Sequence, residues 1–104
     1  MAADGSLSSS AGISVMPDAP TKLVAAARGN AVVLNWNAAA GAKTYSLYRL
    51  ATGGSWMLLK SGITTTTYKD ATASGPFPFS YYVTAVGATG LEGGPSNTVS
   101  VTPR

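Results

Sequence analysis

Three short stretches decide the fold: residues 32–36 are VVLNW, residues 45–49 are YSLYR and residues 79–85 are FSYYVTA. In the first and third, large apolar side chains occupy alternate positions, and the second alternates Tyr45 with Leu47. A period of two puts such side chains on one face of a β-strand, so each stretch is predicted to be a half-buried strand. The tryptophan that ends the first stretch and the aromatic residues of the third suggest two sheets packed face to face.

Seven strands are predicted in all, and turns rich in Gly, Pro, Asn and Ser separate them. They cover residues 22–27, 31–37, 43–50, 55–60, 64–68, 79–86 and 97–102. The Ala-rich segment 38–42 is too short to nucleate a helix. Segments 70–78 and 87–95 are interpreted as loops, the second mobile because it contains four glycines. Turn signals about every eight to twelve residues predict an all-β, seven-stranded, two-sheet sandwich.

Composition excludes several classes of protein. The 104 residues suffice for one domain. The chain has no cysteine and no histidine, which rules out disulfides, thiolate nucleophiles, the usual zinc sites and a Ser-His-Asp relay. The net charge of +3 comes from basic residues spread singly along the chain, whereas phosphate-backbone binding requires clustered cations. We therefore expect no cofactor, no metal and no nucleic-acid partner.

Catalysis is also disfavoured by the placement of the acids. Outside residues 1–16 and Asp18, the acidic residues are Asp70 and Glu92. The predicted strand 79–86 between them spans roughly 26 Å, whereas glycoside hydrolysis uses two carboxylates about 5–9.5 Å apart. Asp70 is interpreted as a turn-former and Glu92 as a solvated loop charge. The glycine-rich segment 87–94 lacks the lysine and the following helix of a phosphate-binding loop, so the chain is predicted not to be an enzyme.

The chain divides into a leader and one domain. Residues 1–16 are rich in Ser, Ala and Gly and are interpreted as a flexible leader, and residues 17–104 form the predicted sandwich. The leader lacks the basic and continuous apolar regions of a signal peptide, and no run approaches the roughly 20 apolar residues of a membrane span. Either the protein stays inside the cell, or the sequence is a secreted or extracellular module of a longer protein with its export signal elsewhere, and we favour the second interpretation.

The order and spacing of a larger set of residues resemble a fibronectin type III domain, of the bacterial kind attached to secreted carbohydrate-active enzymes. The match runs from Asp18 to Pro103. The features that carry it are Ala19-Pro20 with Leu23, Val32-x-Leu34-x-Trp36, Gly41-Ala42-x-x-Tyr45-x-Leu47-Tyr48-Arg49, Tyr68-x-Asp70, Tyr81-Tyr82-Val83-Thr84-Ala85-Val86, Gly90 and Pro95-Ser96-Asn97. The resemblance implies an immunoglobulin-like sandwich with Trp36 at its centre, and it makes strands 43–50 and 79–86 neighbours in one sheet.

One feature of the family is displaced. The family usually has a tyrosine at the start of the sixth strand, whose hydroxyl bonds to nearby backbone. Counting back from Tyr81, that place falls on Phe79, which has no hydroxyl and cannot form this bond. The rigid Pro76 and Pro78 would then hold the preceding loop in its place. With a longer loop, Tyr81 would serve instead.

Three exposed aromatic residues are the candidate site. If Tyr45, Leu47, Tyr81 and Val83 face inward, then Tyr48 and Tyr82 face outward on neighbouring strands, with Trp56 on the next strand. Such a surface can stack on sugar rings or anchor a protein partner. Cross-strand packing that stabilises the sheet is the simpler interpretation.

The leading hypothesis is a non-catalytic spacer or accessory module, a monomer that positions neighbouring domains of a secreted, polysaccharide-degrading bacterial protein. One alternative is a carbohydrate-binding module that uses Tyr48, Trp56 and Tyr82 to hold a polysaccharide. The other is a protein-interaction module of a cell-surface protein that uses its loops or an edge strand. No membrane association is predicted.

Overall fold

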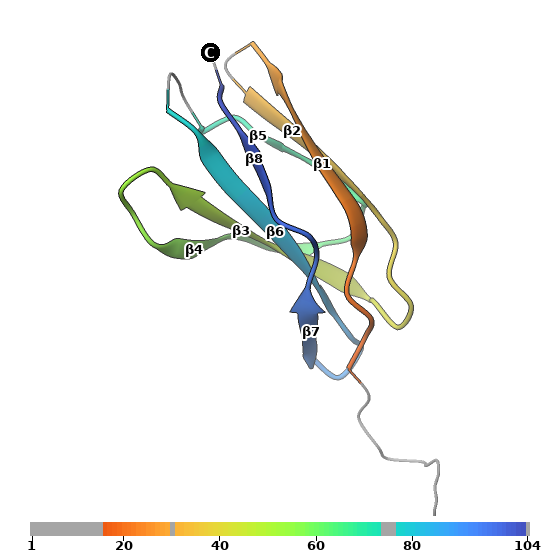
Figure 1. The fold of residues 1–104 in the computed structure, drawn as a ribbon. Helices are drawn as coiled ribbons and strands as arrows, with labels where there is room; N and C mark the ends of the chain where they lie inside the picture. The colour runs from red at the N-terminus through yellow and green to blue at the C-terminus, as the bar shows by residue number, and fades with distance from the viewer. Residues whose placement is uncertain (1–15, 30, 74–76, 104) are drawn as a thin grey trace, which may run out of the picture.

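The structure is a computed structural model that describes residues 16–29, 31–73 and 77–103. These residues form eight strands, which are β1 (Thr21–Arg28), β2 (Ala31–Asn37), β3 (Thr44–Ala51), β4 (Trp56–Ile63), β5 (Thr67–Asp70), β6 (Phe79–Val86), β7 (Glu92–Pro95) and β8 (Val99–Val101). One sheet has the order β1-β2-β5, and the other has the order β4-β3-β6-β7, with β8 also paired to β6. The two sheets face each other (Figure 1), which confirms the predicted all-β sandwich. The predicted leader falls almost wholly outside the described residues.

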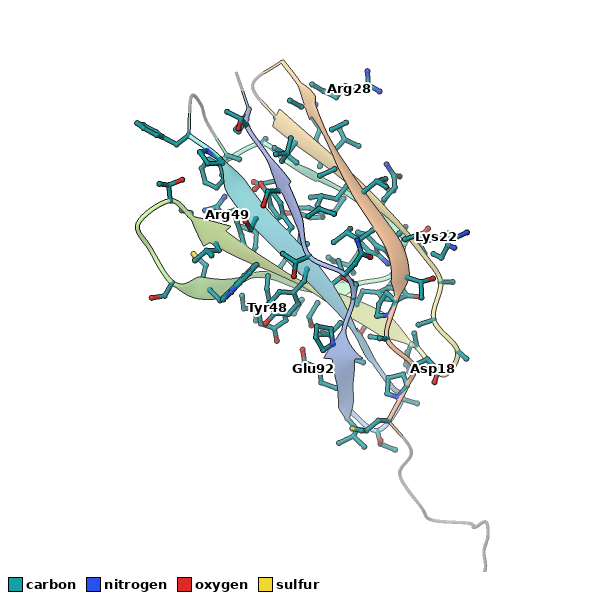
Figure 2. The ribbon with its side chains drawn as sticks, in the orientation of Figure 1. Asp18, Lys22, Arg28, Tyr48, Arg49 and Glu92 are labelled. Carbon is teal, nitrogen blue, oxygen red and sulfur yellow. The ribbon has the colours of Figure 1, made fainter. Side chains whose placement is uncertain are left out.

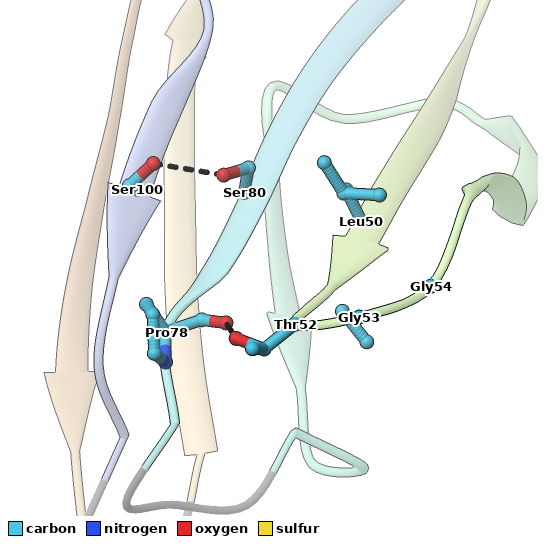
Figure 3. Close-up of a pocket in the computed structure, with 8 residues that line it drawn as sticks. Leu50, Thr52, Gly53, Gly54, Pro78, Ser80 and Ser100 are labelled. Atoms are coloured by element: carbon cyan, nitrogen blue, oxygen red, sulfur yellow. Dashed lines mark hydrogen bonds between the residues drawn. The ribbon is translucent and has the colours of Figure 1, made fainter.

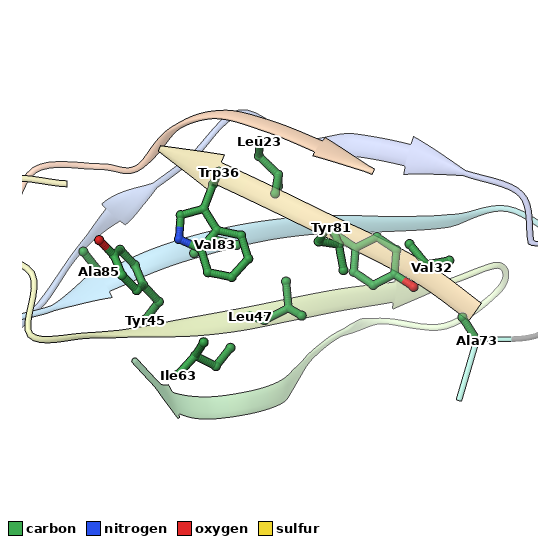
Figure 4. Close-up of a cluster of buried hydrophobic side chains, with 11 residues drawn as sticks. Leu23, Val32, Trp36, Tyr45, Leu47, Ile63, Ala73, Tyr81, Val83 and Ala85 are labelled. Carbon is green, nitrogen blue, oxygen red and sulfur yellow. The ribbon is translucent and has the colours of Figure 1, made fainter. Parts of the chain in front are cut away.

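The core lies between the two sheets, as Figure 4 shows. Leu34 on β2 and Leu47 on β3 are fully buried from opposite sheets. Trp36 is 4% exposed, and its ring meets that of Tyr45 edge-on, with the ring centroids 5.6 Å apart. The inward positions predicted from the period of two are therefore those that fill the core. The full cluster is Leu23, Val32, Leu34, Trp36, Tyr45, Leu47, Ile63, Ala73, Tyr81, Val83 and Ala85.

The number of strands differs from the prediction. Eight strands appear within the described residues because segment 87–95, interpreted from its composition as a mobile loop, contains β7. Two glycines leave β7 without an alternating pattern of side chains, yet its backbone pairs with β6 at Thr84↔Pro95 and Val86↔Glu92. Backbone hydrogen bonding therefore stabilises an element that composition alone did not indicate.

Strand boundaries differ in the middle of the chain as well. β4 continues through Ser61 and Gly62 to Ile63, where the sequence predicted a break. Gly62 has φ of +69°, and the pairing of β3 with β4 shifts register nearby, so the strand bends without ending. β5 correspondingly begins at Thr67 rather than Thr64, and it includes Asp70, which was assigned to a loop.

The buried tyrosine of β6 is Tyr81 and not the residue at position 79. Phe79 is half-buried, with the guanidinium carbon of Arg49 5.2 Å from its ring centroid. Tyr81 is fully buried, and its hydroxyl donates to Asp70 Oδ2 over 2.8 Å. Of the two registers considered, the structure therefore has the one that uses Tyr81, although the acceptor is a carboxylate and not a backbone carbonyl.

The two ends of the sandwich carry the two ends of the described chain. Residues preceding β1 approach beside β7, and the chain leaves past β8 at the opposite end (Figure 1). Pro20, just before β1, and Pro103, just after β8, are both fully buried. A proline fixes φ and adds no donor, so both termini join the sandwich through stiff, enclosed residues.

Candidate functional site on the outer face of the five-stranded sheet

The three predicted aromatic residues come together on the outer face of the five-stranded sheet. Tyr48 of β3 is directly opposite Tyr82 of β6, and Leu50, two residues further along β3, is opposite Trp56 of β4. Tyr81 and Leu47 are fully buried, so their neighbours Tyr82 and Tyr48 point to the other side of the sheet. The placement of Tyr48 and Tyr82 therefore follows the alternation seen in the sequence, and Trp56 joins them from the next strand through its pairing with Leu50.

The three rings pack on one another. Tyr48 and Tyr82 stack with their centroids 4.7 Å apart and an interplanar angle of 16°. Trp56 meets Tyr82 edge-to-face, also at 4.7 Å, with an angle of 61°. Both geometries are favourable for aromatic pairs, so the cluster stabilises the sheet whether or not it binds a ligand. Trp56 is 40% exposed and the two tyrosines are half-buried, so the indole is the ring most open to a partner.

A carboxylate at the edge of the cluster was missed by the sequence analysis. The Tyr48 hydroxyl donates to Glu92 Oε2 over 2.6 Å, and Thr84 Oγ1 donates to the same oxygen; Figure 2 shows Tyr48 beside Glu92. The hydrogen bond to Glu92, followed by burial and by the charge of Glu92, raises the pKa of Tyr48 to about 12. The interpretation of Glu92 as a loop residue is wrong, because it belongs to β7; its side chain is exposed, as the sequence predicted, yet it accepts two hydrogen bonds. No local sequence signal pairs residues so far apart.

A shallow pocket of about 220 Å³ lies on the same sheet, beyond Leu50. Its polar groups are hydroxyls and a carbonyl: Ser80 and Ser100 are hydrogen bonded over 2.8 Å, and Thr52 Oγ1 donates to the Pro78 carbonyl over 2.7 Å (Figure 3). Leu50 lines the pocket and is also the register partner of Trp56. An exposed indole and a neutral, hydroxyl-bearing pocket therefore adjoin the same leucine. The remaining lining residues are Ala51, Gly53 and Gly54.

Asp70 lies on the other side of the sheet from Glu92, inside the sandwich. It is 2% exposed and accepts hydrogen bonds from the hydroxyl of Tyr81, from Arg49 Nη1 at 3.0 Å, and from both the backbone and the side chain of Thr72. The bond to the Thr72 backbone is the turn-forming contact that the sequence predicted. The two carboxylates therefore point to opposite faces, which supports the expectation that they do not share a substrate.

Among residues 16–29, 31–73 and 77–103, no three His, Cys, Asp or Glu side chains lie close enough to hold a metal ion. The same residues include no helix with the length and hydropathy needed to cross a membrane.

The strand order and the enclosed tryptophan define a two-sheet, immunoglobulin-like sandwich. Among solved structures, this chain is similar to a Fn3-like protein from Clostridium thermocellum, with a TM-score of 0.76 and 32% sequence identity. That likeness covers 86% of this chain and 96% of the other. The chain belongs to the fibronectin type III-like family. No family model matches the sequence.

Curated relatives are much longer proteins. The chain is 33% identical over 82 residues to an amylopullulanase of Thermoanaerobacterium thermosulfurigenes, a match to 78% of this chain and 4% of the relative. It is 40% identical over 87 residues to a poly(3-hydroxybutyrate) depolymerase of Ralstonia pickettii, a match to 83% of this chain and 17% of the relative. The chain thus spans less than a fifth of these relatives, and fibronectin type III-like segments similar to it occur within larger enzymes.

Proposed function

We propose that this chain is a non-catalytic spacer module that sets the distance and orientation between neighbouring domains of a secreted, polymer-degrading bacterial protein. The relatives support this proposal because the similar segments are small parts of an amylopullulanase and a polyester depolymerase. The acids support it too, since Asp70 is committed to the interior and Glu92 to the outer face. The module then acts through its shape, and the domains beside it carry the chemistry.

The observation that supports the proposal is that the described residues begin and end at opposite ends of a packed sandwich (Figure 1). A Gly- and Ser-rich tether of about 85 residues has a root-mean-square span of roughly 50 Å with a broad distribution. A sandwich whose interior is closely packed fixes its own span instead. The mechanism is therefore geometric, because a fixed separation keeps a catalytic domain at a constant distance from a domain that holds the polymer.

The test replaces residues 17–103 of the full-length protein by a Gly/Ser tether with the same number of residues. The hydrolysis rate on insoluble polymer is expected to fall several-fold, because the two flanking domains then sample many separations. The rate on a soluble oligomer is expected to stay unchanged, because the catalytic domain itself is untouched. If the replacement leaves the hydrolysis rate on insoluble polymer unchanged, as well as the rate on the soluble oligomer, the spacer role is rejected.

A second candidate function is binding of a neutral polysaccharide at the face formed by Tyr48, Trp56 and Tyr82. The observation that favours it is the exposed indole beside the pocket that bears the Ser80 and Ser100 hydroxyls. Sugar rings present an apolar C–H face, which stacks on aromatic rings, and hydroxyls, which bond to hydroxyls and carbonyls. The residues that line the pocket carry no charge, which suits a neutral ligand of this kind.

Affinity gel electrophoresis in soluble glucans tests this second function. Migration of the parent chain is expected to be retarded, with the retardation lost in Trp56→Ala and in the triple alanine variant of Tyr48, Trp56 and Tyr82. Phe77→Ala is the control, because Phe77 is an aromatic residue outside the cluster and is more exposed, at 60%, than Trp56. Retardation equal to that of a non-binding protein would reject glycan binding. If the chain instead adsorbs to polyester film, the aromatic face binds an apolar polymer and not a glycan.

A further inference from the structure

The segment before β1 is seated in a cradle of glycines. Pro17 is buried, whereas its neighbours Met16 and Asp18 are exposed. A Cβ atom at Gly41 would stand 3.3 Å from Pro17 Cα, and one at Gly93 would overlap the Pro17 carbonyl oxygen. Only residues without a side chain allow the proline to lie this close to the backbone of both the β2–β3 loop and β7.

The cradle consists of the β2–β3 loop and the β6–β7 hairpin, which are hydrogen bonded to each other. The backbone N–H of Asp18 donates to the Ala40 carbonyl over 3.0 Å, which joins the segment to the β2–β3 loop. Lys43 N donates to the Val86 carbonyl over 2.8 Å, which joins that loop to the end of β6. Gly87, which follows β6, also approaches the Pro17 ring. Pro17 therefore lies between the β2–β3 loop and the β6–β7 hairpin, and the hydrogen bond at Asp18 fixes it there.

We propose that Pro17 and Asp18 form a clamp that fixes the direction in which the preceding polypeptide leaves the sandwich. The clamp rests on the proposed spacer function, and it adds the point at which the polypeptide before the sandwich is held, which is residues 17 and 18. Proline has a fixed φ, so a Pro17 held on its ring and carbonyl sides leaves little freedom at the joint. Any hinge then lies before residue 17 and not at the sandwich itself.

Two adjacent glycines in β7 make a matched test of the clamp. A Cβ atom at Gly94 would meet no atom within 4 Å, whereas one at Gly93 would overlap Pro17. Neither glycine has a positive φ, so an alanine at either position costs no backbone strain. Gly93→Ala therefore displaces the proline, and Gly94→Ala changes the same strand without touching it.

Amide hydrogen exchange on the full chain measures the clamp locally. The Asp18 amide is expected to exchange slowly in the parent and in Gly94→Ala, and at least about tenfold faster in Gly93→Ala. The Trp36 amide, which donates to the Thr66 carbonyl over 3.0 Å, reports on the intact sandwich and is expected to stay protected in all three. Exchange of the Asp18 amide at the rate of an unfolded chain in the parent, or equal rates in the two variants, would overturn the proposal.

Distances between two spin labels measure the consequence at the joint. The chain has no cysteine, so Met16→Cys and Lys60→Cys, both at exposed positions, label only those sites. The distance distribution is expected to be narrow in the parent and in Gly94→Ala, and broad in Gly93→Ala. If Gly93→Ala fails to fold, Pro17→Gly removes the ring and restores backbone freedom without a change in any strand, and it is expected to broaden the distribution in the same way.

The outcome for the clamp is separate from the outcome for the spacer. A broad distribution in the parent rejects the clamp even if replacing residues 17–103 by a tether still slows hydrolysis of insoluble polymer. A narrow distribution with no effect of that replacement keeps the clamp and rejects the spacer role.

Discussion

The hydroxyl of Tyr81 donates a 2.8 Å hydrogen bond to Asp70, and this bond crosses the interior from one sheet to the other. Asp70 ends β5 of the three-stranded sheet, and Tyr81 lies on β6 of the five-stranded sheet. Arg49 of β3, itself 15% exposed, adds a 3.0 Å ion pair to the same carboxylate oxygen. A buried charge is tolerable only when it is paired and hydrogen bonded, and here the partners are Arg49 and Tyr81 of the five-stranded sheet and Thr72 just after β5. The contacts of Asp70 with Tyr81 and Arg49 therefore fix the position of one sheet relative to the other.

Replacing Tyr81 by phenylalanine tests the contribution of this bond. We expect Tyr81→Phe to lower the free energy of unfolding by about 1–3 kcal/mol, because a buried carboxylate loses one donor while the ring remains. Urea unfolding followed by circular dichroism measures the change. Tyr82→Phe, at the next position on the outer face, is the control and is expected to change stability by less than about 0.5 kcal/mol. Equal effects of the two variants would show that the interior hydrogen bond carries no special stability.

Acid is expected to destabilise the protein through Asp70. Burial by itself would raise the pKa of Asp70, but the hydrogen bonds from Thr72, Tyr81 and Arg49 outweigh it and hold the pKa below its ordinary value of 3.8. A depressed pKa contributes stability above the pKa of the unfolded chain, and this stability is lost as the pH falls through the pKa of the folded state. The unfolding free energy should therefore decrease below about pH 4.

The variant Asp70→Asn isolates this effect, because its side chain has no carboxylate to protonate. At pH 7 it is expected to be less stable by about 3–5 kcal/mol, since the half-buried Arg49 loses its counter-charge. Its stability should then depend less on pH in the acid range than that of the parent. Thr72→Ala removes one side-chain hydrogen-bond donor and keeps the charge of Asp70, so its stability at pH 7 should lie between those of the parent and Asp70→Asn. Parallel pH profiles for the parent and Asp70→Asn would contradict the assignment.

The fold was predictable from sequence where side chains alternate between two environments. Val32, Leu34 and Trp36 must share one face of a strand, so the burial of that face followed directly from their spacing. The same alternation placed Tyr48 and Tyr82 on the outer surface, and the family resemblance placed their strands side by side. Leu58 of β4 lies opposite Tyr48 and is exposed, so it extends the apolar outer face beside the two tyrosines.

Features that depend on partners distant in sequence were not predictable in this way. β7 is held by backbone pairing with β6, and a Glu-Gly-Gly-Pro segment gives no periodic signal. The bond between Tyr48 and Glu92 joins residues 44 positions apart, and the pair of Arg49 and Asp70 joins residues 21 positions apart. Neither pair follows from local propensity, because both depend on the register between strands.

Truncation of the two tryptophans is expected to destabilise the protein by very different amounts. Trp36→Ala should lower the free energy of unfolding by about 3–5 kcal/mol, because it empties the centre of the core. This loss is a large part of the roughly 5–15 kcal/mol by which a typical domain is stable. Trp56→Ala should cost less than about 1 kcal/mol, because its ring is 40% exposed. Chemical unfolding of both variants measures the difference, and comparable losses would contradict the central placement of Trp36.

Fluorescence gives an independent measure of the same burial in a protein that stays folded. In Trp56→Phe the remaining emission comes from Trp36, whose indole N–H has no partner among the described residues. We expect a blue-shifted native spectrum that moves to the red on unfolding, because unfolding exposes the ring to water. A native spectrum like that of tryptophan in water would place the indole outside the core.

The hydrogen bond between Tyr48 and Glu92 predicts an unusual alkaline titration. Because the bond to Glu92 raises the pKa of Tyr48 to about 12, the folded state keeps this phenol protonated when the unfolded chain, with a tyrosine pKa near 10, begins to ionise. The associated stability is present below about pH 10 and is lost as the pH rises through 12. Glu92→Gln keeps an acceptor but removes the charge, so it should lower the pKa of Tyr48 toward 10. Carbon NMR shifts of labelled tyrosines follow each phenol separately, and Asp18→Asn removes an acid that makes no bond to Tyr48. An unchanged Tyr48 pKa in Glu92→Gln, or an equal fall in Asp18→Asn, would mean that Glu92 is not what holds this tyrosine on the outer face.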